Sequence, residues 1–148
     1  MKLILPHALQ ARIEALACDA FPAECCGLME GVADGGALQI LALHPARNIA
    51  AARDRFEIHP EDHFKALRTA RANSRAIVGC FHSHPGGQAN PSEVDRQGGG
   101  EENFVWLIAA LAGTGGPVDV AAFVYSAKSF LPVDLARPVG ADFVTSSE

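Results

Sequence analysis

Apolar positions along the chain repeat with two different periods, and each period predicts a different kind of element. Four apolar residues near the N-terminus recur at helical spacing: Leu9, Ile13, Leu16 and Ala17. They predict a helix over residues 6–20 that ends before Pro22. A second helix is expected from Pro60, because acidic residues follow it directly and basic residues come later, as the helix dipole favours. Shorter apolar runs predict strands over residues 25–30, 37–43, 55–58, 76–81, 104–112, 118–125 and 130–135.

The order of these elements is helix, strands, helix and strands, which predicts the α+β class with a mixed β-sheet flanked by helices. An Asp-Gly-Gly run at residues 34–36 favours a hairpin between the first two strands. A short helical turn is expected over residues 92–97, ended by glycines at 98–100. The length of 148 residues predicts one domain over residues 1–148, with a core at about residues 5–125 and a C-terminal strand and tail to 148.

Composition and charge exclude several classes of protein. Hydrophobic residues make up 49% of the chain and charged residues 20%, which is enough apolar surface to form a packed domain. The net charge of −5 and the lack of a basic run argue against a nucleic-acid partner. The longest apolar run, residues 104–112, is too short to span a bilayer, and the N-terminus does not resemble a secretory signal. We therefore expect a cytoplasmic protein with no membrane partner.

The cysteines and most of the histidines are not expected to form a site. The four cysteines contain no C-x-x-C pair, and we expect them to be free, buried side chains: Cys18, Cys25, Cys26 and Cys80. His7 and His44 adjoin prolines and are expected in exposed turns. His59 and His63 superficially resemble the zinc motif H-E-x-x-H, but that motif needs a glutamate where this chain has Pro60.

Residues 80–95 contain the strongest chemical signal in the sequence. His82 and His84 lie two positions apart at the end of a predicted strand, so their rings project from the same face of the sheet. Two neighbouring imidazoles can bind a tetrahedral zinc ion, and we expect Pro85 to take the chain out of the sheet after them. Asp95 follows closely enough for the loop to fold it back as a third, oxygen ligand. Three protein ligands with an open fourth position are typical of catalytic zinc.

Two alternatives without a metal also fit these residues. The run from Ser92 to Asp95 matches a helix capping box, which needs no metal. An isolated His-x-His pair is more often a surface feature than a site. Here the two patterns occur together with Pro85, and the glycines end the capped helix within two turns. The combination therefore favours a metal site.

These residues resemble the motif of the JAMM, or MPN-plus, family of zinc metalloproteases. That motif is an upstream glutamate followed by His-x-His-Pro, a short loop and Ser-x-x-Asp, and this chain supplies His82 to Pro85, Ser92 and Asp95 in the same order and spacing. Residues 22–28, which contain Glu24, are similar to the family's glutamate segment, and residues 48–62 to its stretch before the second helix. The resemblance covers residues 5–125 and is closest to compact prokaryotic members.

The resemblance implies a single MPN-type domain with a three-layer arrangement like that of cytidine deaminase. It implies that His82, His84 and Asp95 hold Zn²⁺. It also implies that Glu24 moves a proton and that Ser92 donates a hydrogen bond to the oxyanion. The expected activity is zinc-dependent hydrolysis of a peptide or isopeptide bond at the C-terminal tail of a ubiquitin-like or sulfur-carrier protein. Such a tail would suit an exposed sheet edge as an added strand.

Some details depart from the family pattern. His59 stands where relatives often carry an acidic residue, and the glycines at 98–100 interrupt a helix that relatives extend, which predicts weaker support under Asp95. Glu93 and Glu101 are the alternative bases if Glu24 is not one. The sequence does not predict an oligomeric state.

Three other functions agree less well with these residues. A DNA-repair-associated protein of the RadC type has a serine where this chain has Gly86, and the acidic net charge also opposes that function. A non-catalytic MPN scaffold module normally lacks the metal ligands. A zinc nucleotide deaminase needs H-x-E and P-C-x-x-C, which do not occur in the sequence.

Overall fold

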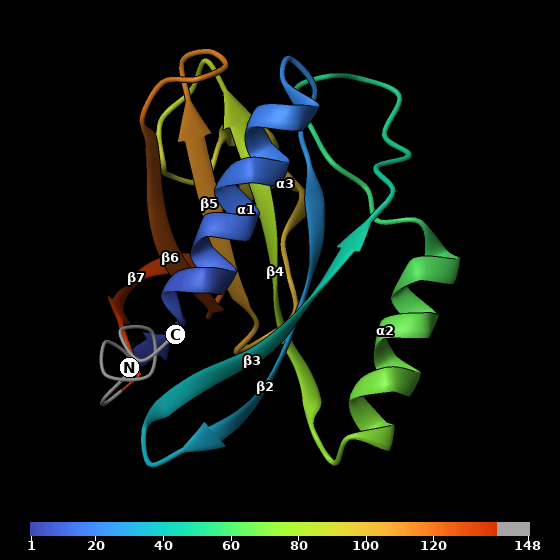
Figure 1. The fold of residues 1–148 in the computed structure, drawn as a ribbon, viewed down its shortest axis with the longest axis vertical. Helices are drawn as coiled ribbons and strands as arrows, with labels where there is room; N and C mark the ends of the chain where they lie inside the picture. The colour runs from blue at the N-terminus through green and yellow to red at the C-terminus, as the bar shows by residue number, and fades with distance from the viewer. Residues whose placement is uncertain (139–148) are drawn as a thin grey trace.

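The computed structural model describes residues 1–138, which form three helices and seven strands (Figure 1). The helices are α1 (His7–Ala20), α2 (Pro60–Ala72) and α3 (Glu93–Gly98). The strands are β1 (Lys2–Ile4), β2 (Cys26–Asp34), β3 (Ala37–Ala46), β4 (Ala76–Pro85), β5 (Val105–Leu111), β6 (Val118–Ser126) and β7 (Ser129–Ala136). None of the described helices is long and apolar enough to cross a membrane.

The strands form one mixed sheet in the order β1-β3-β2-β4-β5-β6-β7, and β7 pairs again with β1. The pairs of β1 with β3, of β1 with β7 and of β4 with β5 are parallel, and the others are antiparallel. The expected mixed sheet with helices is confirmed, but its closure was not predicted. Strand β1 closes the sheet, but it has only three residues. A run this short shows no hydrophobic period from which a strand could be predicted.

The two long helices pack on opposite faces of this sheet. Phe81 of β4 belongs to the larger apolar cluster, which contains Ile13 and Ala17 of α1. The preceding residue, Cys80, points to the other face and belongs to the smaller cluster, which contains Ala66 of α2. Alternation along a strand sends successive side chains to opposite faces. Figure 1 accordingly shows α1 and α2 well apart, with the strands between them.

Two segments near the site differ from their predicted structure. Residues 55–58 are not a strand, because their pairing is limited to one isolated bridge between Asn48 and Ile58. Pro85 does not take the chain out of the sheet: it is the last residue of β4 and pairs with Leu111. The chain turns away at the next residue, Gly86, whose φ of 72° favours glycine.

His44 is also not the exposed turn residue expected from its neighbouring proline. It lies in β3, and its Nε2 is 2.8 Å from Oε1 of the fully buried Glu30 on β2. The other carboxylate oxygen of Glu30 accepts hydrogen bonds from Asn73 at 3.2 Å and Arg75 at 3.1 Å. A buried charge needs such partners, so this cluster explains an acidic residue within the buried part of β2.

Candidate metal centre

Strand β4 and helix α3 bring three possible metal ligands to one point. His82 and His84 project from the same face of β4, as expected from their spacing. Nε2 of His82 is 2.9 Å from Nε2 of His84 and 3.3 Å from Oδ2 of Asp95. Nε2 of His84 is 3.1 Å from the same oxygen. All three side chains are buried, with exposed fractions of 0%, 7% and 6%.

The spacing of these atoms fits a tetrahedral zinc ion. Ligand atoms at zinc distances of about 2.0–2.2 Å in a tetrahedron are about 3.3–3.6 Å apart. The three observed separations are 2.9, 3.1 and 3.3 Å, so shifts of a few tenths of an ångström would bring all three atoms to zinc-binding distances. Two imidazole nitrogens and one carboxylate oxygen are donors that zinc accepts, and they leave a fourth position open. The residues present therefore fit the metal that the sequence predicts.

The surroundings of the two imidazoles orient their ring nitrogens and shift their pKa values in opposite directions. Nδ1 of His84 is 2.9 Å from the carbonyl oxygen of Gln88. Because a carbonyl can only accept, Nδ1 carries a proton and Nε2 is the ring nitrogen that faces Asp95. Burial would lower the pKa of His84, but its hydrogen bond to Asp95 raises it above the usual value. His82 is stacked on Phe56, with ring centroids 4.3 Å apart, and meets Trp106 edge-on at 5.5 Å. Burial among these rings lowers the pKa of His82 and keeps its ring uncharged.

Ser92 and Asp95 form the capping box that the sequence allowed as an alternative. Oγ of Ser92 accepts a hydrogen bond from the Asp95 amide at 3.0 Å, and Oδ2 of Asp95 accepts one from the Ser92 amide at 2.8 Å. That oxygen is the one that faces both imidazoles. Burial would raise the pKa of Asp95, but hydrogen bonds from His82 and His84 lower it well below its usual range. Capping and metal binding are therefore compatible roles of the same carboxylate.

The glycines after α3 make a close packing contact. Gly99 has a φ of 66°, and a Cβ on Gly100 would lie 3.1 Å from the Tyr125 ring. The chain therefore passes tightly over Tyr125 at this point.

Glu24 lies two residues before β2 and brings a second carboxylate to the site. One of its oxygens and the ring nitrogens of His82 and His84 all lie within 4.8 Å of one another. The residue is 6% exposed, and among the described residues its Oε1 has no hydrogen-bond partner. Burial raises the pKa of Glu24 to about 7, although the positive charge of His84 opposes the rise. The alternative bases, Glu93 and Glu101, are exposed.

A cleft of about 380 Å³ opens over this centre. It is lined by Glu24, His84 and Ser92, and by the charged residues Arg53 and Asp54. The remaining lining residues are the last residue of β4 and residues of the loop that follows it: Pro85, Gly87, Gln88, Asn90 and Pro91. A molecule that enters the cleft would meet the Glu24 carboxylate, the His84 ring and the Ser92 hydroxyl together.

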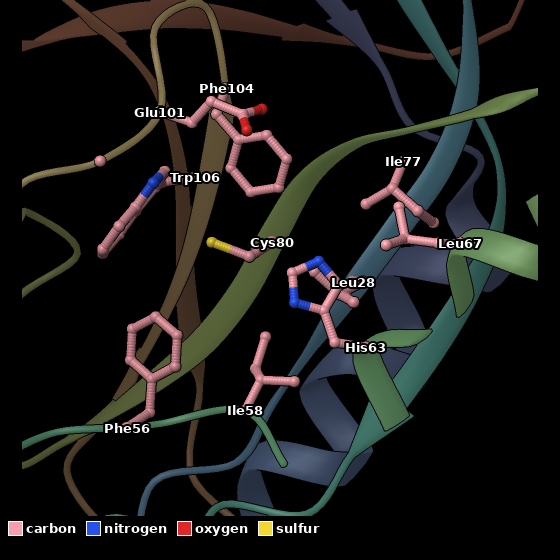
Figure 2. Close-up of a pocket in the computed structure, with 11 residues that line it drawn as sticks. Leu28, Phe56, Ile58, His63, Leu67, Ile77, Cys80, Glu101, Phe104 and Trp106 are labelled. Atoms are coloured by element: carbon pink, nitrogen blue, oxygen red, sulfur yellow. The ribbon is translucent and has the colours of Figure 1, made fainter. Parts of the chain in front are cut away.

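A separate apolar cavity of about 370 Å³ lies between α2 and the sheet (Figure 2). Phe56 and Trp106 form one side of it, and these are the same rings that contact His82. Leu67 and His63 of α2 line the opposite side. The structure agrees with the rejection of an H-E-x-x-H zinc motif here, since His59 caps α2 by accepting a hydrogen bond from the Glu61 amide at 3.1 Å.

Sequence reasoning missed three residues that support the site: Asn48, Phe56 and Ser83. Asn48 bonds the carbonyl of Glu24, Phe56 stacks on His82, and Oγ of Ser83 accepts a hydrogen bond from the Cys25 amide at 2.8 Å. For Asn48 and Phe56, the only signal in the sequence was the similarity of residues 48–62 to a segment of the family.

The cysteines are free, as expected, and two of them, Cys26 and Cys80, are buried.

A buried pair of imidazoles and one carboxylate, beside a second carboxylate with a raised pKa, is the donor set of a catalytic metal site in a hydrolase. The model of the family of prokaryotic homologs of the JAB domain matches residues 6–124. The chain belongs to this family, and the resemblance to JAMM proteins is confirmed.

Two relatives with similar sequences are both named desampylase. The one from Haloferax volcanii is 36% identical over 90 residues, which are 60% of this chain and 63% of that protein. The one from Pyrococcus furiosus is 32% identical over 107 residues, or 72% of each chain. The chain thus spans less than two thirds of the Haloferax relative.

Solved structures show the same fold. A protein from Desulfitobacterium hafniense has a TM-score of 0.83 at 25% identity, with 93% of each chain covered. A protein from Salinibacter ruber has a TM-score of 0.71 at 31% identity and covers 93% of this chain and 92% of its own.

Proposed function

We propose that this protein is a zinc-dependent hydrolase that cleaves a peptide or isopeptide bond at the C-terminal tail of a ubiquitin-like or sulfur-carrier protein. The observation that carries the proposal is the convergence of His82, His84 and Asp95 on one point, with the carboxylate of Glu24 beside them. In this proposal the first three residues hold zinc and Glu24 remains free for proton transfer.

The two carboxylates have different environments, which supports different roles. Asp95 accepts hydrogen bonds and stays ionised, as a metal ligand must. Glu24 is buried without a partner for Oε1, and its pKa of about 7 suits a group that takes and returns a proton near neutral pH. Zinc, when bound, would supply the Lewis acidity that activates water and polarises the scissile carbonyl. Glu24 would accept the proton of the attacking water and deliver it to the leaving amine.

Ser92 is proposed to stabilise the oxyanion. Its Oγ accepts the Asp95 amide hydrogen, so the hydroxyl proton remains available for donation. The side chain lines the same cleft as Glu24 and His84. A preorganised donor at such a position contributes about 3 kcal/mol to the transition state.

The proposed substrate enters the cleft over the centre, because the strands of residues 1–138 form a closed barrel and none of them is left as a free edge strand along its whole length. A cleft of about 380 Å³ accommodates few side chains, and a Gly-Gly tail carries none. The names of the two desampylase relatives also favour a carrier-tail substrate. The competing functions have less support, because a scaffold module has no use for the ligand set and a DNA-repair role gains nothing from an acidic chain.

The test is hydrolysis of a ubiquitin-like carrier joined through its Gly-Gly terminus to a lysine side chain of a short peptide. A linear fusion of the same carrier runs in parallel. We expect zinc-loaded protein to release the carrier from at least one of the two, and chelation to abolish release until zinc is restored. Cleavage of neither by the zinc-loaded protein would contradict the proposed substrate class.

A further inference from the structure

Asn48, just after β3, uses the whole hydrogen-bonding capacity of its side-chain amide. Nδ2 donates to the carbonyl oxygen of Glu24 at 3.0 Å and to that of Arg55 at 3.3 Å. Oδ1 accepts from the amides of Ala50 at 3.0 Å and Glu57 at 2.9 Å. An asparagine amide has two donor hydrogens and two acceptor lone pairs, so these four bonds leave none of them free.

Two of these bonds lie on either side of Phe56. The carbonyl of Arg55 and the amide of Glu57 both contact Asn48, and the ring between them stacks on His82 at 4.3 Å with an interplanar angle of 21°. Residues 55–57 belong to no strand. The position of the Phe56 ring against a proposed metal ligand therefore depends on the Asn48 side chain, together with the backbone hydrogen bond from the Ile49 amide to the carbonyl oxygen of Glu57 at 2.9 Å.

A third bond fixes the backbone of Glu24. This residue precedes β2, so no strand ladder holds its carbonyl. Its neighbour Cys25 is tied to Ser83 through the Ser83 hydroxyl at 2.8 Å and the Ser83 amide at 3.1 Å. Oε1 of Glu24 has no partner among the described residues. The direction of this carboxylate is consequently set by its backbone, which Asn48 holds on one side and Ser83 on the other.

We propose that Asn48 is a positioning residue that fixes the Glu24 carboxylate and the Phe56–His82 stack relative to each other. The inference rests on the proposed function and adds the residue that couples the base to the metal ligands. Proton transfer requires contact distances, and a displacement of about 1 Å can cost about 10²-fold in rate. A side chain that touches neither substrate nor metal can therefore control the rate.

Two substitutions separate this role from simple support of a loop. Asn48→Asp keeps an oxygen for the amides of Ala50 and Glu57 but removes both donors, including the bond to Glu24. Asn48→Ala removes all four bonds. The matched control is Asn73→Ala, which removes a hydrogen bond to the buried Glu30, in a cluster that includes none of the proposed site residues.

The readouts are kcat and KM on the carrier fusions, zinc content, melting temperature, and hydrogen exchange at the Cys25 and Glu57 amides. We expect both Asn48 variants to lose at least about tenfold in kcat with KM nearly unchanged. They should keep zinc and exchange faster at both amides. Asn73→Ala should lower the melting temperature and leave kcat within about twofold.

A kcat within twofold of wild type in both Asn48 variants, with a lower melting temperature, would overturn the proposal and leave Asn48 a structural residue. If the wild type cleaves no carrier fusion, the proposed substrate fails separately. Exchange then decides the positioning role: faster exchange at Cys25 and Glu57 supports it, and unchanged exchange at both amides overturns it.

Discussion

Ser92 and Asp95 hydrogen-bond each other in both directions, at 2.8 and 3.0 Å, while the accepting oxygen of Asp95 lies 3.1 Å from Nε2 of His84. The first turn of α3 thus holds the carboxylate before any metal arrives. Preorganisation of this kind reduces the entropy lost on binding. One short motif combines a helix cap, a proposed ligand and a proposed oxyanion donor.

The two roles of Ser92, as an oxyanion donor and as a helix cap, predict different results for Ser92→Ala. If the hydroxyl donates to the oxyanion, turnover should fall by about 10²-fold or more with zinc content unchanged. Loss of the cap alone should cost about 1 kcal/mol of stability with turnover close to wild type. A rate measurement beside a thermal melt distinguishes the two, and unchanged turnover would remove Ser92 from the chemistry.

Glu24→Gln tests the proposed base. Glutamine has nearly the same shape and cannot accept the proton, so we expect hydrolysis to fall by at least about 10²-fold. Zinc content should stay at the wild-type level. The melting temperature should be equal or slightly higher, because the carboxylate is buried without a partner for Oε1. Retained activity would direct attention to Glu93 or Glu101, and lost zinc would make Glu24 a ligand.

Glu30 predicts a pH-dependent contribution to stability. Burial would raise its pKa, but hydrogen bonds from His44, Asn73 and Arg75 lower it below the ordinary value. A carboxyl whose pKa is lowered by folding stabilises the protein above its unfolded pKa, and this contribution is lost as the pH falls through the folded pKa. Glu30→Gln should therefore cost about 1–3 kcal/mol at neutral pH.

The difference between this variant and wild type should shrink below about pH 4. Thermal melts across pH check this, with the exposed Asp134→Asn as a control that should show little difference at any pH. A difference that stays constant with pH would contradict the charged role of Glu30.

Gly27 provides a packing prediction next to the base. A Cβ at this position would clash with the Phe81 ring and would lie 2.6 Å from the carbonyl oxygen of His44. Gly27→Ala should therefore destabilise the protein by about 1–3 kcal/mol or more. The control is Gly98→Ala, since a Cβ there meets nothing within 4 Å. Equal melting temperatures of the two variants would show that β2 can shift to make room.

Much of the fold and site could be predicted from the sequence, because these features depend on residues that lie close together in the chain. The period of α1 and the spacing of His82 and His84 each depend on neighbours in the chain. The closure of the sheet by β1, the pairing of His44 with Glu30 and the stack of Phe56 on His82 depend on contacts between distant segments. No period or spacing encodes such contacts, and Glu24 was identified only by family resemblance.

The central claim is that His82, His84 and Asp95 hold one zinc ion. The most direct measurement is the zinc content per chain of wild type and of the His82→Ala/Asp95→Ala double variant, after equilibration with zinc and desalting. Cys26→Ser/Cys80→Ser serves as the control that should retain the metal. The account predicts close to one zinc in wild type and in the cysteine variant, and almost none in the His82/Asp95 variant. Equal zinc in all three proteins would contradict it.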